Sequence, residues 1–267
     1  MASERIEPLF FGSKDRRLFG CHHAPSQGPT PKLGVVIAPA LGHEYSRAHR
    51  AQRQLAGSCA AAGLRALRFD FSATGDSHGD RWPDSLRPWR EDLELALREL
   101  ASRTRVARTA LLGVRVSANL AVDCAARNPA CAALVLWDPC FDGAAHEQSL
   151  RQAQERFEAS LSSPIRRVSA AQAGFECLGY HWPAALLGEL RAWRAPSFEQ
   201  GAPQRVLILE STISPRASEL AALLAKRGAR VVHEPSRGSQ PWNDEVDQGL
   251  VPAVDLGRII DFLREES

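Results

Sequence analysis

The side chains with the chemistry of acyl transfer gather at one turn and its neighbours. The turn Gly113-Val114-Arg115-Val116-Ser117 joins an apolar run to a helical pattern. This is the setting of a nucleophile elbow, a sharp strand-to-helix turn that exposes a nucleophilic side chain. Here Arg115 holds the nucleophile position, and a guanidinium cannot attack a carbonyl carbon. Ser117 follows half a turn into the helix, so we expect its hydroxyl to point away from the elbow.

Three more candidates for catalysis follow predicted strand ends. His43 is the best candidate for a general acid or base, because a histidine titrates near physiological pH. Glu44 is a second candidate base, and Asp138 is a candidate acid. A buried guanidinium such as that of Arg115 needs an anionic partner. The candidates are a substrate carboxylate or phosphate and the side chains of Glu44, Asp76 and Asp138. Whether Arg115 fixes the surrounding loops or anchors a substrate stays open.

Seven further residues in the same loops are candidates for contact with a substrate. They are Tyr45, Ser46, Arg47, Ser117, Cys140, Gln240 and Trp242. Cys140 follows a strand end, where a cation such as Arg115 could lower the pKa of the thiol and make it a nucleophile. The alternative for Cys140 is a small buried side chain. The six cysteines do not have the spacing of a metal site, and we expect neither a metal nor another cofactor.

The elements that position these residues alternate between strands and helices. Short strands are predicted at 9–11 and 17–22, and buried strands at 34–38, 64–71, 109–112, 131–137, 205–209 and 229–233. Helices are predicted after the turn at 113–117 and at 46–62, 84–102, 215–227 and 254–264. Such alternation indicates an α/β fold with a mainly parallel sheet flanked by helices. Ligands bind at the carboxyl ends of strands in such sheets. That rule selects the loops 39–47, 72–80, 113–117, 138–143, 210–215 and 234–245.

The segment 141–201 differs from the rest of the chain. It is rich in Gln, Glu, Arg and Ala and has no buried-strand pattern. We therefore predict a core formed by residues 1–140 and 202–267, with 141–201 as a helical insertion after the sixth strand that serves as a lid. Aromatic residues of the insertion could line a pocket for an acyl group, or they could fasten the insertion to the core.

Length and composition favour one large domain. The chain has 267 residues, 44% of them hydrophobic. No apolar run approaches the roughly 20 residues of a membrane span. A net charge of +2 without a dominant basic cluster argues against a nucleic-acid partner. The N-terminus has no apolar signal segment, so we expect a cytoplasmic protein whose partner is a small molecule with an acyl or carboxylate group. The sequence does not indicate an oligomeric state.

Several segments together resemble one known superfamily. They are residues 42–50, 67–71, 75–80, 113–118 and 134–139. In this order they are similar to the loops of the α/β-hydrolase superfamily. More narrowly, they resemble the exosortase-A-associated hydrolases and their serine-aminopeptidase-like relatives. In that group an arginine tends to occupy the elbow, as Arg115 does, whereas Ser117 departs from the glycine that the relatives tend to carry. The resemblance implies the α/β-hydrolase fold.

The resemblance also implies where a catalytic acid and base would lie. The acid position corresponds to Ser214, which precedes a proline and is predicted to cap a helix. The base position falls in the turn 237–242, where Gln240 stands and no histidine is present, while His233 lies in the preceding strand. Because Arg115, Ser214 and Gln240 replace all three triad members, ordinary Ser-His-Asp hydrolysis is not expected.

Three functions remain open, and we expect the first. It is a non-standard enzyme that acts on an acyl, ester or thioester intermediate in a biosynthetic pathway, where Arg115 holds the substrate and His43 or Glu44 moves a proton. The second is a catalytically inactive relative of the hydrolases that binds a small acidic ligand or a partner protein. The third, esterase or peptidase activity through a displaced serine, ranks last because all three triad positions are altered.

Overall fold

A central eight-stranded sheet forms the core of the part of the chain that the computed structural model describes, residues 4–26, 33–162, 173–242 and 251–265. In the order of pairing its strands are β1 (Glu4–Ser13), β2 (Arg16–Pro25), β4 (Arg65–Phe69), β3 (Leu33–Ala38), β5 (Arg108–Val114), β6 (Cys131–Trp137), β9 (Arg205–Glu210) and β10 (Arg230–Pro235). β2 pairs antiparallel with β1 and with β4, and the other neighbours are parallel. The predicted α/β fold with a mainly parallel sheet is confirmed.

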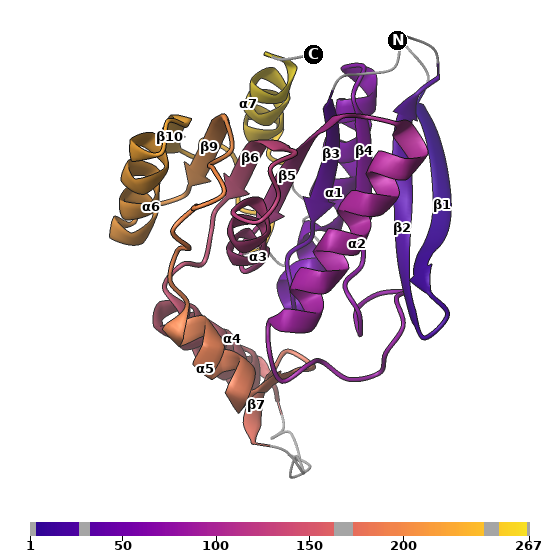
Figure 1. Ribbon diagram of the computed structural model, residues 1–267. Helices are drawn as coiled ribbons and strands as arrows, with labels where there is room; N and C mark the ends of the chain where they lie inside the picture. The colour runs from indigo at the N-terminus through magenta and orange to yellow at the C-terminus, as the bar shows by residue number, and fades with distance from the viewer. Residues whose placement is uncertain (1–3, 27–32, 163–172, 243–250, 266–267) are drawn as a thin grey trace.

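Helices cover both faces of this sheet (Figure 1). One face carries α1 (His43–Ala61) and α7 (Ala253–Arg264), and the other carries α2 (Arg87–Thr104), α3 (Ser117–Ala125) and α6 (Pro215–Lys226). Successive strand residues alternate between the two apolar cores, so Val35 and Ile37 face α1 while Val36 faces α2. Burial on both faces explains why β3 is apolar along its whole length, as parallel strands commonly are.

The segment after β6 forms a smaller layer beside the sheet (Figure 1). It contains α4 (Gly143–Ser160), a hairpin of β7 (Gly174–Cys177) and β8 (Tyr180–Pro183), and α5 (Ala184–Ala192). Besides the predicted helices the segment contains this hairpin, which the sequence did not indicate because its strands are too short to show a periodic pattern. Trp182 packs edge-on against Trp82 of the core at 4.9 Å between ring centroids. Residues 163–172 lie outside the described part, and the division at 141–201 and the lid role stay predictions.

One boundary changes what the site contains. α1 begins at His43 instead of the predicted Ser46, because Gly42 takes a left-handed φ of 65° and turns the chain directly into the helix. Residues 43–47 therefore form the first turn of α1, not a loop over the strand ends. At the other end of the chain, the predicted loop 234–245 is described only as far as Trp242.

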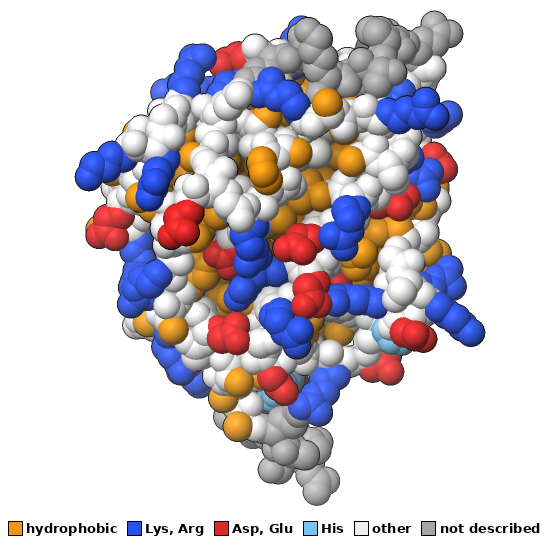
Figure 2. Space-filling model, viewed as in Figure 1, with side chains coloured by type: hydrophobic (Ala, Val, Ile, Leu, Met, Phe, Trp, Pro, Cys, Tyr) orange, Lys and Arg blue, Asp and Glu red, His pale blue; other side chains and the backbone are white. Residues whose placement is uncertain are grey.

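The surface carries both signs of charge. Basic and acidic side chains are interspersed on the face shown in Figure 2, and neither sign forms one continuous patch there. All six cysteines are buried and none forms a disulfide. This agrees with cysteines that act as small apolar side chains in the core. None of the described helices combines the length and apolar character needed to span a bilayer.

Candidate functional site

The predicted elbow is present between β5 and α3. Arg115 adopts a left-handed φ of 57°, a conformation that costs a non-glycine residue energy and is concentrated at functional sites. The helix turns back close to the strand, since a Cβ atom at Gly113 would lie 2.6 Å from the Cα atom of Ala118. Only glycine at position 113 allows this approach. The backbone of an elbow is therefore kept, and an arginine side chain projects from its tip.

Both carboxylates that the sequence offered as close partners bind the Arg115 side chain. Its Nε donates to Glu44 Oε1 at 3.0 Å, and its Nη2 lies 2.9 Å from the same oxygen. Its Nη1 donates to the main-chain oxygen and to Oδ2 of Asp138, both at 3.0 Å. The third candidate, Asp76, is exposed and makes no such contact. The Arg115 side chain is 15% exposed, and its guanidinium is thus bound on both sides by the protein itself.

Asp138 extends this network to two more loops. Its Oδ1 accepts hydrogen bonds from the amide (2.8 Å) and hydroxyl (2.7 Å) of Ser211, and its Oδ2 accepts one from Trp242 Nε1 at 3.0 Å. The Trp242 ring also lies 5.5 Å from the Arg115 guanidinium, within cation–π range. We call Glu44, Arg115, Asp138, Ser211 and Trp242 the elbow network. The network joins the segments after β3, β5, β6, β9 and β10, so it holds these five segments together and has a structural role.

The two serines near the elbow, Ser117 and Ser214, have structural partners as well. Ser117 has no exposed surface, and its hydroxyl donates to the main-chain oxygen of Pro39. The prediction that it points away from the elbow is confirmed, and its expected contact with substrate was wrong because it is buried beneath the turn. Ser214 caps α6 by accepting from the Ala217 amide at 3.2 Å, as predicted. Gln240 is half-buried and does not line the cavity described below.

The sequence analysis missed a histidine–carboxylate pair at this edge. His233 Nε2 lies 2.6 Å from Glu210 Oε2, and Glu210 Oε1 accepts from the Ser214 hydroxyl at 2.7 Å. The signal was available, because β9 and β10 were both predicted and each carries a titratable residue near its carboxyl end. The carboxylate stands between serine and histidine, which is not the order of a catalytic triad, in which the histidine must contact the serine.

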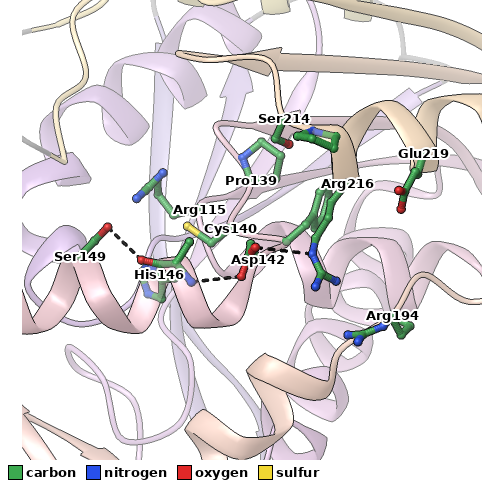
Figure 3. Close-up of a pocket in the computed structure, with 13 residues that line it drawn as sticks. Arg115, Pro139, Cys140, Asp142, His146, Ser149, Arg194, Ser214, Arg216 and Glu219 are labelled. Carbon is green, nitrogen blue, oxygen red and sulfur yellow. Dashed lines mark hydrogen bonds and ion pairs between the residues drawn. The ribbon is translucent and has the colours of Figure 1, made fainter.

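A cavity of about 610 Å³ opens beside the elbow (Figure 3). Its walls come from the segment after β6, the first turns of α4 and α6, and the segment after α5. They include Arg115, Pro139, Cys140, Phe141, Asp142, Ala145, His146, Ser149, Arg194, Ser214, Pro215, Arg216 and Glu219. Of the residues predicted to touch a substrate or act in catalysis, only Arg115 and Cys140 line this cavity.

The residues of the first turn of α1 do not line this cavity, and the three predicted to contact a substrate make hydrogen bonds within the protein. Tyr45 donates its hydroxyl to Asp70 Oδ1 at 2.8 Å, which fastens α1 to the loop after β4. The exposed Ser46 donates to the His43 carbonyl at 3.1 Å, and Arg47 donates to the main chain of Trp242 at 3.3 Å. Trp242 itself is only 1% exposed. The early start of α1 places these side chains on the first turn of a helix, where Tyr45 and Arg47 reach neighbouring segments and Ser46 bonds within the helix.

Two buried histidines flank the region between the core and the insertion. His43 is 8% exposed, with Nδ1 3.7 Å from the Cys177 thiol, and burial lowers its pKa from 6.5 to about 4. His146 on α4 is 5% exposed and packs 5.5 Å from the Trp182 ring, and burial lowers its pKa to about 3. Among the described residues neither ring nitrogen of His146 has a hydrogen-bond partner. Both imidazoles are therefore neutral at neutral pH. The sequence analysis did not identify His146, because a single histidine within a helix has no pattern that would mark it as a site residue.

Cys140 lies beside Arg115 without becoming a thiolate. Burial raises the pKa of its thiol and outweighs the opposing effect of the Arg115 cation. Glu44 and Asp138 neutralise that cation and act in the same direction as burial. The small buried side chain, the alternative offered by the sequence, is the state that the structure supports.

Comparisons with known proteins identify the fold and leave the family undefined. No protein-family model matches the chain, and no curated protein matches it. A hypothetical protein from Pseudomonas aeruginosa is 16% identical over 100% of this chain and 94% of its own, with a TM-score of 0.67. Est1E from Butyrivibrio proteoclasticus, solved with ferulic acid bound, is 16% identical over 97% of this chain and 98% of its own, with a TM-score of 0.65.

A mammalian protein shows the same likeness. The mouse alpha/beta hydrolase domain-containing protein 10 is 16% identical over 98% of this chain and 100% of its own, with a TM-score of 0.59. At such identities the likeness concerns the fold, since one fold supports many activities. The chain has the α/β-hydrolase fold.

Proposed function

We propose that this chain binds a small acyl compound in the cavity beside Arg115 and does not cleave it through a serine. The observation that carries the proposal is the state of the elbow, where Arg115 is held by Glu44 and Asp138 at the edge of a cavity of about 610 Å³. Ser117 is buried and Ser214 caps a helix. The described residues around the elbow therefore supply a binding cavity without an activated nucleophile.

The lining of the cavity supports an acyl ligand. Phe141 and Ala145 contribute apolar surface, and His146 contributes an imidazole whose nitrogens have no partner among the described residues. A neutral imidazole donates one hydrogen bond and accepts another, which suits a carbonyl or carboxyl group. Est1E, which has the same fold, is solved with ferulic acid bound. The same proposal includes three expectations from the sequence. They are a relation to the exosortase-A-associated hydrolases, a role in a biosynthetic pathway, and a lid role for residues 141–201.

The absence of serine chemistry is tested with a fluorophosphonate probe, which labels activated serines. We expect no labelling of the purified protein under conditions that fully label an authentic serine esterase. Labelling that disappears in Ser214→Ala or Ser117→Ala would contradict the proposal, because it would show a nucleophile where the structure has a capping or buried hydroxyl.

Binding is tested with hexanamide, a neutral acyl probe, followed by NMR signals of the histidine imidazoles. We expect saturable shifts of the His146 signals and weaker binding in His146→Phe. His78→Phe is the matched control, since His78 is exposed in the loop after β4. Equal affinity of both variants would remove His146 from the site.

A second candidate, the non-standard enzyme expected from the sequence, is favoured by the same unpartnered imidazole. His146 could accept a proton from water as that water adds to a thioester carbon, and return the proton to the sulfur as the C–S bond breaks and the thiol leaves. Its lowered pKa makes it a weak base, which is why binding without turnover ranks first. Incubation with a hexanoyl thioester and detection of free thiol separates the two, because only the enzyme releases thiol in a manner that His146→Phe abolishes.

A further inference from the structure

Two helices begin at the mouth of the cavity and both present their amino ends to it (Figure 3). Asp142 caps α4 by accepting from the amides of Ala144 (3.1 Å) and Ala145 (3.0 Å), and Ser214 caps α6. The first turns of both helices, through Ala145 and Arg216, line the cavity. Because the amino end of a helix carries a partial positive charge, two such ends beside one cavity favour a negatively charged group there.

Two arginines from different elements lie at the same mouth. Arg216 comes from the first turn of α6, and its Nε lies 3.8 Å from Asp142 Oδ2. Arg194 follows α5, and its Nη1 donates to the carbonyls of Arg191 (3.2 Å) and Trp193 (2.7 Å). No carboxylate of the described residues lies within ion-pair distance of Arg194. Figure 3 shows both guanidinium groups beyond Asp142, on the side away from Arg115.

The cavity lining also contains an independent sign of a ligand. His146 is 5% exposed, lines the cavity, and has no hydrogen-bond partner among the described residues on either ring nitrogen. Buried polar groups are normally paired, so such a group points to a bound molecule or water. The lining holds the cations Arg194 and Arg216 together with the carboxylates of Asp142 and Glu219, and Arg194 is the cation among them without a carboxylate partner in the described residues. His146 adds a neutral polar group. The cavity lining thus combines charged groups, a neutral imidazole and the apolar ring of Phe141.

We propose that the ligand is an acyl compound that carries an oxyanion, a carboxylate or a phosphate, and that Arg194 and Arg216 bind this group at the mouth. This inference rests on the proposed binding function and adds the charge of the ligand and its direction in the cavity. The planar guanidinium groups bind either oxyanion through paired N–H donors. Arg115 does not serve this purpose, because Glu44 and Asp138 already neutralise it.

The test compares three probes with the same six-carbon chain: hexanamide, hexanoate and hexyl phosphate. Dissociation constants are measured by calorimetry on the full chain at low salt. We expect at least one anion to bind about tenfold more tightly than hexanamide, and we expect added salt to reduce that preference. Tighter binding of hexyl phosphate identifies a phosphate-bearing ligand, and tighter binding of hexanoate identifies a free carboxylate.

Variants locate the effect. Arg194→Gln and Arg216→Gln are each expected to reduce the affinity for the anion toward that for hexanamide while leaving hexanamide binding unchanged. Arg151→Gln is the matched control, because Arg151 lies on α4 outside the cavity lining and pairs with Glu147 at 2.7 Å. It removes the same charge and is expected to leave all three affinities unchanged.

Two outcomes overturn this inference and spare the proposed function. One is hexanamide binding as tightly as the anions. The other is an anion preference that survives both Arg194→Gln and Arg216→Gln or falls equally in Arg151→Gln. Failure of all three probes to bind overturns the proposed binding function itself, so the two failures are distinguishable.

Discussion

Replacing Arg115 by methionine tests whether the elbow network is a structural fastener. Methionine retains much of the length of arginine and removes its charge. Glu44 is 5% exposed and loses the cation that binds its carboxylate, whereas Asp138 keeps its hydrogen bonds from Ser211 and Trp242. Leaving a buried charge without its partner costs about 3–5 kcal/mol. We therefore expect the Arg115→Met variant to lose about this much free energy of unfolding.

A double-mutant cycle assigns that loss to its cause. Urea unfolding is followed by tryptophan fluorescence in the wild type, Arg115→Met, Glu44→Gln and the double variant. If the cost comes from the unpaired Glu44 charge, Glu44→Gln should restore at least about 1 kcal/mol to the Arg115→Met protein, because contacting residues couple by about 0.5–3 kcal/mol. An exposed pair supplies the control: Arg87→Met breaks the contact with Glu91 and should cost less than about 1 kcal/mol.

The reasoning is refuted if Arg115→Met loses less than about 1 kcal/mol, which is the range of an exposed ion pair. It is also refuted if the two substitutions are additive, since additivity would mean that Glu44 and Arg115 do not stabilise each other. In either case Arg115 would be free for a ligand, and its candidacy as a substrate anchor would return.

Three further predictions follow from other parts of the fold. Gly113→Ala should destabilise the protein by about 1–3 kcal/mol in thermal unfolding, because a Cβ atom meets the backbone of α3. Gly257→Ala in α7 meets nothing within 4 Å and should stabilise it by up to about 1 kcal/mol; equal effects of the two would contradict the close approach at the elbow. Ser214→Ala should cost about 1 kcal/mol through loss of the α6 cap, and a glycine at position 214 should cost less; a neutral alanine would argue against the cap. Because burial lowers the pKa of His43 to about 4 and of His146 to about 3, the unfolded chain takes up protons below about pH 6.5 that the folded chain does not. The free energy of unfolding should stay constant above that pH and fall toward pH 4, by up to about 1.4 kcal/mol per pH unit for each histidine. Urea unfolding measured at several pH values should therefore show that the stability of His146→Phe depends less on pH than that of the wild type.

The sequence predicted those parts of the fold that local pattern determines. The bounds of β6 were correct because a continuous apolar run ended by Asp138-Pro139 allows only one interpretation. The cap at Ser214 was correct because a serine before a proline has a local physical role. The sequence also predicted that Arg115 would have an anionic partner, because a buried cation needs one. Glu44 and Asp138, which bind it, were among the candidates.

What the sequence could not predict depends on contacts between distant segments. The cavity is formed where α4, α6 and the segment after α5 meet, so Arg194 and Arg216 carry no local sign of belonging to one site. His146 is buried by Trp182, a residue of a hairpin too short to show a pattern. Tyr45 was expected in a loop and lies in α1, because the positive φ of Gly42 starts this helix earlier than predicted.

The elbow network limits how this chain could acquire the reaction typical of its fold. A single change of Arg115 to serine would put a hydroxyl at the elbow, but it would leave Glu44 without a cation and Asp138 committed to Ser211 and Trp242. At the carboxyl edge of the described sheet, His233 is the histidine that contacts a carboxylate. It is paired with Glu210 and does not line the cavity beside position 115. Intermediates with one or two changes would be both less stable and inactive. The arginine is therefore entrenched, and the scaffold is separated from serine catalysis by several coupled substitutions.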